Sequence, residues 1–209
     1  MFSTSTAIIN NEEFASSYMP VGINKNVTLK EVTVKKSPQG KDFLEIVFEN
    51  SEGQTATMSV WKNEKGMYIK TDEDLQRRDN AQFGNMMQIL NCFYPTVEDV
   101  TLNSFKEMID WVSSKLNPMI ATKKALTLKV IYDNKGYTKV STNGIFVEPA
   151  DTTESQIKLF KSDRLERPVK ADEEKPTDPL AVNATQAEST PVTSGDTVDH
   201  GADTNALPF

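Results

Sequence analysis

The spacing of apolar residues changes twice along this chain, and that change limits its fold more than any other feature. Apolar and polar residues alternate over about residues 27–62, with the two-residue period of a half-buried β-strand. Over residues 72–124 the apolar residues recur every three or four positions, as they do on one face of an α-helix. Alternation returns at about residue 126. The predicted order is therefore three strands, a helical segment and two strands.

Turn residues divide the first alternating stretch into three strands. Typical turn sequences occur at residues 37–40 (SPQG) and 51–53 (SEG). The apolar parity of the first strand changes near residues 30–31, which predicts a β-bulge that bends the strand. The third strand is predicted from about Thr55 to Lys62, and it directs Trp61 away from the buried side.

The helical segment contains two amphipathic patterns. Ser104 and Glu107 have the spacing of a capping box at the start of the second helix, and Pro118 is expected to follow its end. The apolar residues are expected to pack in the core. One face of the first helix carries Phe83, Met86, Met87 and Leu90, and one face of the second helix carries Phe105, Met108, Ile109, Val112 and Leu116.

The last two strands complete the predicted fold class. A hairpin turn at residues 133–136 (DNKG) joins a strand that begins at Leu126 to a strand from Tyr137 to about Phe146. A mainly β chain with a helical insertion between strands three and four has the arrangement of the five-stranded oligonucleotide/oligosaccharide-binding (OB) barrel. A bent first strand helps such a barrel to close. An open α+β sheet satisfies the same pattern and remains the alternative.

Charge and composition divide the chain into regions. We predict an N-terminal arm (residues 1–20), an OB-like domain (21–150) and a flexible acidic tail (151–209). Residues 171–209, called the acidic segment below, contain eight acidic residues and one lysine, whereas residues 1–170 contain 22 acidic and 22 basic residues. The net charge of −7 therefore comes from the acidic segment and does not argue against an anionic ligand for the domain. The acidic segment has no aromatic residue before its last position, so it is predicted to be disordered.

The residues needed for common catalytic and metal sites are scarce. The chain has one cysteine, Cys92, and one histidine, His200, and the histidine lies in the predicted tail. This argues against a histidine-based triad, a Cys–His pair and a zinc site of Cys and His ligands. We interpret the acidic run at residues 72–74 as the first turn of a helix, where the helix dipole favours acids, rather than as a metal site. We therefore expect no enzymatic activity, no metal and no cofactor.

The cellular setting is also predicted from composition. A single cysteine is typical of a reducing compartment. The first residues lack the basic start and apolar run of a signal peptide, and no apolar run approaches the roughly 20 residues of a membrane helix. We expect a soluble, cytoplasmic protein that does not contact membranes.

Aromatic and basic side chains on the outward face of the predicted barrel are candidates for binding single-stranded nucleic acid. Aromatic rings stack bases, and lysines neutralise the backbone without reading sequence. The alternative interpretation is that the tryptophan caps the end of the barrel and that the lysines are ordinary solubilising charges. The predicted nucleic-acid-binding residues on this face are Trp61, Tyr137, Lys129 and Lys139, and those at nearby strand ends and loops are Lys62, Lys35 and Lys36.

The final residues, Leu207, Pro208 and Phe209, restore apolar character at the end of the acidic segment. Proline restricts the backbone, so less entropy is lost when a pocket binds Phe209. Such a tip suits a partner protein that offers an apolar pocket for the ring and a basic side chain for the carboxylate. The acidic segment is also expected to compete with DNA for the lysines, an effect that salt would weaken.

The chain resembles the single-stranded DNA-binding proteins of bacteria and tailed bacteriophages. The resemblance rests on Pro208-Phe209 at an acidic end and on the opening strands, which include residues 21–24 (VGIN) and 43–50 (FLEIVFEN). It departs from the family at Asn205-Ala206, where acidic residues usually precede the tip. The resemblance implies single-stranded DNA binding in replication, recombination and repair, in the host cytoplasm if the protein is phage-encoded.

The resemblance also implies recruitment of replication or recombination proteins by the tip, and it allows a homo-oligomer. Two other functions stay open at this point. A virion-associated or adaptor protein would use the same barrel to bind protein, and a metal-dependent nuclease would need a metal site among the acidic residues.

Overall fold

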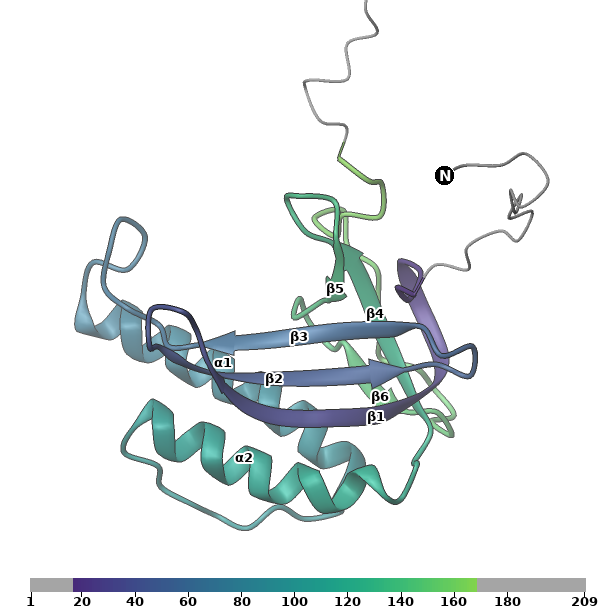
Figure 1. The fold of residues 1–209 in the computed structure, drawn as a ribbon, viewed down its shortest axis with the longest axis horizontal. Coiled ribbons are helices and arrows are strands. Elements are labelled where there is room, and N and C mark those ends of the chain that lie inside the picture. The colour runs from purple at the N-terminus through teal and green to yellow at the C-terminus, as the bar shows by residue number, and fades with distance from the viewer. Residues whose placement is uncertain (1–16, 169–209) are drawn as a thin grey trace, which may run out of the picture. The chain divides into compact units, whose positions relative to one another are not determined.

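The structure, a computed structural model, describes residues 17–168 (Figure 1). The predicted order of three strands, two helices and two strands is confirmed, and one further short strand follows. The elements are β1 (Gly22–Lys36), β2 (Asp42–Glu49), β3 (Thr55–Trp61), α1 (Asp72–Phe93), α2 (Phe105–Ile120), β4 (Leu126–Tyr132), β5 (Thr138–Val140) and β6 (Val147–Pro149).

The strands form a nearly closed, antiparallel barrel of five strands. Their hydrogen-bonded order is β3-β2-β1-β4-β5, and β6 pairs with β4 beside this path. β3 and β5 lie next to each other at the ends of the path, but within residues 17–168 no strand ladder joins them. The fold is therefore mainly β with a helical insertion between β3 and β4, as predicted.

A bend in β1 makes this closure possible. The pairing of β1 with β2 shifts register between Leu29 and Glu31, so the predicted β-bulge is confirmed. A second shift occurs between Asn24 and Val27 in the pairing of β1 with β4. Because of these irregularities, the first part of β1 pairs with β4 and the second part pairs with β2.

The core lies between the inward faces of the strands and the two helices. Leu44, Ile46 and Phe48 alternate along β2 and are completely buried, as a two-residue period requires. α2 packs against β1 and β2, whereas α1 packs against α2 and β6 (Figure 1). No helix within residues 17–168 is long and apolar enough to cross a membrane.

The start of α2 agrees with prediction, but its end does not. The Glu107 N–H donates to the Ser104 hydroxyl over 3.1 Å, while the Glu107 carboxylate accepts from the Asn103 N–H at 2.9 Å. In a capping box this carboxylate would accept from the N–H of the N-cap residue, Ser104, which is one residue later. Pro118 lies inside α2, so the prediction that it follows the helix is wrong. Because it lies near the C-terminus, its missing N–H removes one of the last bonds and the helix continues to Ile120.

The predicted final strand is interrupted. β5 covers only Thr138–Val140, and the chain then bends before β6 returns to pair with β4. Gly144 in this bend has φ +68°, a conformation that suits glycine. The sequence STNG at residues 141–144 is typical of a turn, which the apolar alternation alone does not indicate.

Both ends of the described segment belong to the barrel. Tyr18 forms a parallel bridge with Thr55, and Met19 is completely buried, although both lie in the predicted N-terminal arm. Residues 151–168 lie in the predicted tail, yet they form one compact unit with the domain and bury Ile157 and Asp163. The domain therefore extends past the predicted boundary at residue 150.

Candidate nucleic-acid interface

The outward face of β2 and β3 carries a pair of stacked aromatic rings. Strand register places Phe43 of β2 opposite Trp61 of β3 and, on its other side, opposite Lys35 of β1. The centroids of the Phe43 and Trp61 rings are 4.2 Å apart, and the ring planes differ by 14°. Trp61 remains 43% exposed. The phenylalanine thus supports the indole on one side while leaving a flat apolar surface open to solvent.

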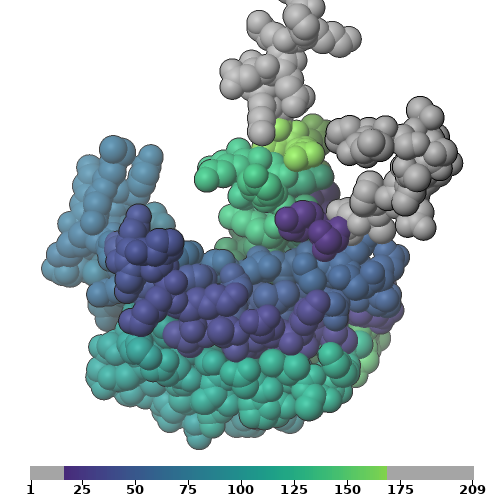
Figure 2. Space-filling view, viewed as in Figure 1, coloured from purple at the N-terminus to yellow at the C-terminus, as the bar shows by residue number. Residues whose placement is uncertain are grey.

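The surface around Trp61 is hollowed. A cavity of about 400 Å³ has Trp61 in its wall, and a second of about 530 Å³ shares Lys62 with it. Figure 2 shows a broader hollow over β3, between the segment of residues 62–71, called the 62–71 loop, and the β4–β5 hairpin. The first cavity is lined by Lys41, Asp42, Trp61, Lys62, Glu64, Ser104, Phe105 and Lys106.

The two predicted lysines of β1 are accessible to solvent, but acidic neighbours neutralise them. Lys35 forms an ion pair with Glu45, and this hydrogen bond is the largest cause of a raised pKa of Lys35. Lys36 lies 3.2 Å from the Asp42 carboxylate. Within residues 17–168, no ion pair involves Lys62 or Lys139, and both are exposed. The second pair of lysines is therefore better placed than the first to bind phosphate.

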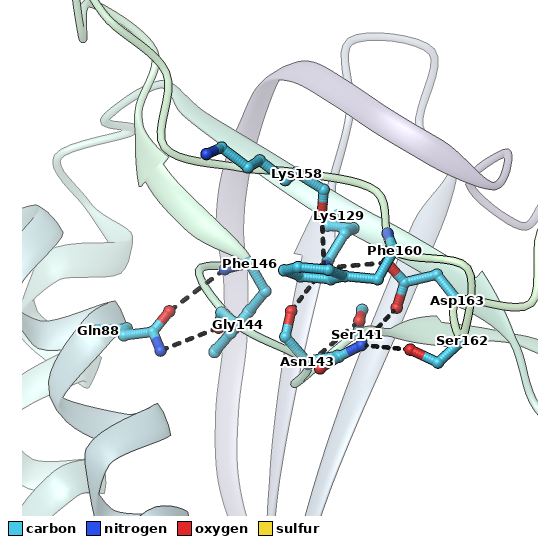
Figure 3. A network of polar contacts seen from close by, with 10 residues as sticks. All are labelled: Gln88, Lys129, Ser141, Asn143, Gly144, Phe146, Lys158, Phe160, Ser162 and Asp163. Carbon is cyan, nitrogen blue, oxygen red and sulfur yellow. Dashed lines mark hydrogen bonds and ion pairs between the residues drawn. The ribbon is translucent and has the colours of Figure 1, made fainter.

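The prediction that Lys129 is accessible to DNA is wrong. Its side chain is 0% exposed, and its Nζ lies 3.2 Å from the Asp163 carboxylate (Figure 3). The same Nζ donates to the carbonyl oxygens of Asn143, at 2.5 Å, and Lys158, at 3.0 Å. Strand parity does place Lys129 on the outer side of β4, but residues 151–168 cover that side. Lys129 is thus a structural residue and is removed from the candidate site.

Asp163 completes this buried network. Burial alone would raise the pKa of its carboxyl, but hydrogen bonds from the Phe160 N–H, the Asn143 amide and Lys129 outweigh it and lower the pKa. The Phe160 ring lies 4.7 Å from Lys129 Nζ and covers the pair. A Cβ atom on Gly144 would lie 2.8 Å from this ring, so glycine is also required for packing. The network fixes residues 158–163 against β4 (Figure 3).

Tyr137 and Lys139 lie on the β4–β5 hairpin. Tyr137 precedes β5 and is 58% exposed, and Lys139 is exposed within β5. Asp133 holds the turn by accepting from the N–H groups of Tyr137 and Lys135, at 2.9 and 2.8 Å. The Tyr137 N–H is the largest cause of the lowered pKa of Asp133. The predicted residues that remain candidates thus fall into two groups, with Trp61 and Lys62 where β3 meets the 62–71 loop and Tyr137 and Lys139 on the hairpin across the hollow.

Sequence reasoning missed two aromatic residues near this surface. Tyr68 is 82% exposed at the tip of the 62–71 loop, where the Gly66 N–H donates to the Ile69 carbonyl over 2.9 Å. The available signal was an aromatic residue between Lys65 and Lys70 in a segment that joins a strand to a helix. Phe43 was also missed, although its position beside inward-facing Leu44 in the alternation of β2 places it on the outward face.

The acidic run at residues 72–74 forms the first turn of α1. The Thr71 hydroxyl caps this helix by accepting from the Asp74 N–H at 3.0 Å. Asp72 pairs with Lys65 and Asp74 pairs with Arg77. In the part of the chain that the structure describes, no three His, Cys, Asp or Glu side chains gather to hold a metal ion.

The other predicted site lies elsewhere in the chain. The tip residues Leu207, Pro208 and Phe209 fall outside the described residues. Comparison with known proteins adds no assignment, because neither a search of protein-family models nor a search of curated proteins found a match.

Proposed function

We propose that this protein binds single-stranded DNA without catalysis and with little sequence preference. The observation that carries the proposal is the exposed Trp61 ring, stacked on Phe43 and followed by Lys62, which is exposed and makes no ion pair with another of residues 17–168. A supported aromatic ring beside a lysine is the arrangement on which an unpaired base stacks while its phosphate is neutralised. A base inside a duplex has no free face to offer such a ring.

The fold supports the same proposal. A five-stranded, nearly closed barrel with its helical segment between β3 and β4 fits the OB fold, whose strand face and adjoining loops bind oligonucleotides. Fold alone does not determine function. Here the aromatic pair occupies β2 and β3, and the candidate lysines follow β3 or lie in β5.

The roles of the side chains follow from their exposure and charge. Trp61 stacks one base, and Tyr137 stacks another on the opposite side of the hollow. Lys62 and Lys139 hold phosphates. The centre of the β1–β2 face offers less attraction, because its lysines are paired with glutamates such as Glu45. Binding through stacking and phosphate contacts carries little sequence information.

The tip of the acidic segment is proposed to bind proteins rather than DNA. The composition of this segment predicts a disordered arm, and its apolar tip suits a pocket on a replication or recombination protein. The proposal concerns residues outside the described structure, so it rests on sequence and on the resemblance to single-stranded DNA-binding proteins.

Titration of tryptophan fluorescence with oligo-dT, at low and moderate salt, tests the proposed function. Trp61 is exposed, whereas Trp111 lies half-buried on α2 beside Phe83, with ring centroids 6.0 Å apart. We expect quenching by single strands that weakens as salt rises, and much weaker binding of duplex of the same length. The Trp61→Phe variant should lose most of the quenching. Equal affinity for duplex, or no binding at low salt, would reject the proposal.

A protein-binding adaptor is the second candidate. The observation in its favour is the exposed tip of the 62–71 loop, where Met67 and Tyr68 present apolar surface. This function predicts no affinity for DNA at low salt and a large assembly in solution. Failure of the oligo-dT titration, together with a high molecular mass by light scattering, would favour it.

A further inference from the structure

The β4–β5 hairpin and residues 158–168 together form a basic surface, called the basic lobe below. It also contains three acidic residues. Asp163 is buried against Lys129, Asp133 accepts hydrogen bonds in the hairpin turn, and Glu166 is exposed. The hairpin was predicted to bind DNA only through Tyr137 and Lys139, and residues 158–168 were assigned to the tail. The exposed cations of the lobe are Lys135, Lys139, Lys158, Lys161, Arg164 and Arg167.

Residues 158–168 are held in place on the hairpin. The Tyr132 N–H donates to the Arg164 carbonyl over 2.8 Å, and the Arg164 guanidinium donates to the Asn134 side chain. The Lys158 carbonyl accepts from Lys129, while the Lys158 side chain points away from the network (Figure 3). The positions of the basic side chains are therefore set by a fixed backbone.

The cations of the basic lobe differ from the lysines of the β1–β2 face. Lys30, Lys35 and Lys36 each pair with a carboxylate of β2. No ion pair within residues 17–168 involves an exposed cation of the lobe, and Arg164 contacts only a neutral amide there. An anion that binds the lobe therefore displaces no ion-paired carboxylate of residues 17–168, although Asp133 attracts Lys135 and Lys139 electrostatically.

The lobe borders the proposed binding surface. Its β4–β5 hairpin, which carries Tyr137, lies on the other side of the hollow over β3 from the 62–71 loop (Figure 2), and residues 158–168 contact that hairpin. A strand that stacks on Trp61 and crosses the hollow would reach it. We propose that the basic lobe, including Lys158 and Lys161, binds the phosphates of single-stranded DNA and extends the binding track beyond β3. This inference rests on the proposed function.

The double variant Lys158→Gln, Lys161→Gln tests the proposal. Both side chains are exposed and make no ion pair within residues 17–168, so the fold should be retained. Each phosphate contact to a single strand contributes about 0.7 to the slope of log affinity against log salt. Losing two contacts should lower the slope by about 1.4 and weaken binding to a long oligo-dT roughly 25-fold at 0.1 M salt.

The matched control is Lys123→Gln, Lys124→Gln. These exposed lysines precede β4, at the opposite end of that strand from the hairpin, and their replacement removes the same charge. The control should bind like the unaltered protein. Equal losses in both variants would show a general charge effect and overturn the proposal, as would an unchanged slope in the lobe variant. Failure of the unaltered protein to bind oligo-dT would instead reject the proposed function.

Discussion

Trp61 is exposed because the alternation of side chains along β3 directs it away from the core, and the Phe43 ring stacks on it. The two rings are nearly parallel, so the open side of the indole is presented to solvent with its orientation fixed. A fixed ring loses little conformational entropy when a base stacks on it. At this scale, the binding proposal depends on one side chain and on the neighbour that positions it.

Replacing Trp61 by alanine should weaken binding of oligo-dT by about 1–3 kcal/mol, because one stacking contact is lost. Phe43→Ala should cause a smaller loss, since the indole remains but is no longer supported. The measurement is anisotropy of a labelled oligonucleotide at fixed salt, with thermal unfolding to confirm the fold. An unchanged affinity for Trp61→Ala would remove Trp61 from the site.

Cys92 has no role in the proposed function, and its burial predicts that its thiol reacts slowly. Burial is the main cause that raises the pKa of its thiol to about 12, with Glu148 adding to the effect and Lys124 opposing it. At pH 8 roughly one thiol in ten thousand is then ionised, and the thiolate is the reactive form. A thiol-specific reagent should react slowly with the folded protein and rapidly in denaturant. Rapid reaction without denaturant would contradict the burial of this residue.

At the scale of elements, the pair of Lys129 and Asp163 joins residues 151–168 to β4. Removing one partner of a buried pair leaves an uncompensated charge and costs about 3–5 kcal/mol. We expect Lys129→Met and Asp163→Asn each to lower the free energy of unfolding by an amount near this range. The combined variant should lose less than the sum of the two. Additive losses in denaturant unfolding would show that the two side chains do not stabilise each other.

The same pair predicts a dependence on pH. The pKa of Asp163 is lower in the folded protein than its usual value near 3.9, so its contribution to stability is complete above that value. The contribution is lost as pH falls toward the folded pKa. The difference in unfolding free energy between the unaltered protein and Asp163→Asn should therefore shrink from pH 7 to pH 3. A constant difference across this range would contradict an ionised Asp163 in the folded state.

Local sequence patterns predicted some features of the strands but not which segments cover them. Alternation predicted the outward position of Trp61, and the change of parity predicted the bulge near Leu29, because both depend on local geometry. Lys129 has the same outward parity, but parity gives only the side of a strand and not what covers it. The covering segment, residues 151–168, has few apolar residues and packs largely through polar contacts to β4. Those contacts are between distant parts of the chain, so no local pattern predicts them.

At the scale of the whole molecule, charge is separated along the chain. Residues 17–168 carry 21 basic and 20 acidic side chains, whereas residues 171–209 carry an excess of seven negative charges. The unpaired cations of residues 17–168 include those of the basic lobe, and an acidic arm on the same chain is present at a high effective concentration. The acidic segment should therefore compete with DNA phosphates for these cations, and salt should weaken the competition.

Truncation after Pro168 tests this competition, since the described residues include the whole barrel and the segment that covers β4. The truncated protein should bind oligo-dT as tightly as the full chain or more tightly, with the largest gain at low salt. It should also fail to capture the replication or recombination proteins that the full chain is proposed to bind. A control that replaces only Phe209 by alanine should lose the partners without gaining DNA affinity, because the acidic residues remain. Weaker DNA binding after truncation would contradict competition and would place DNA contacts in the removed residues instead.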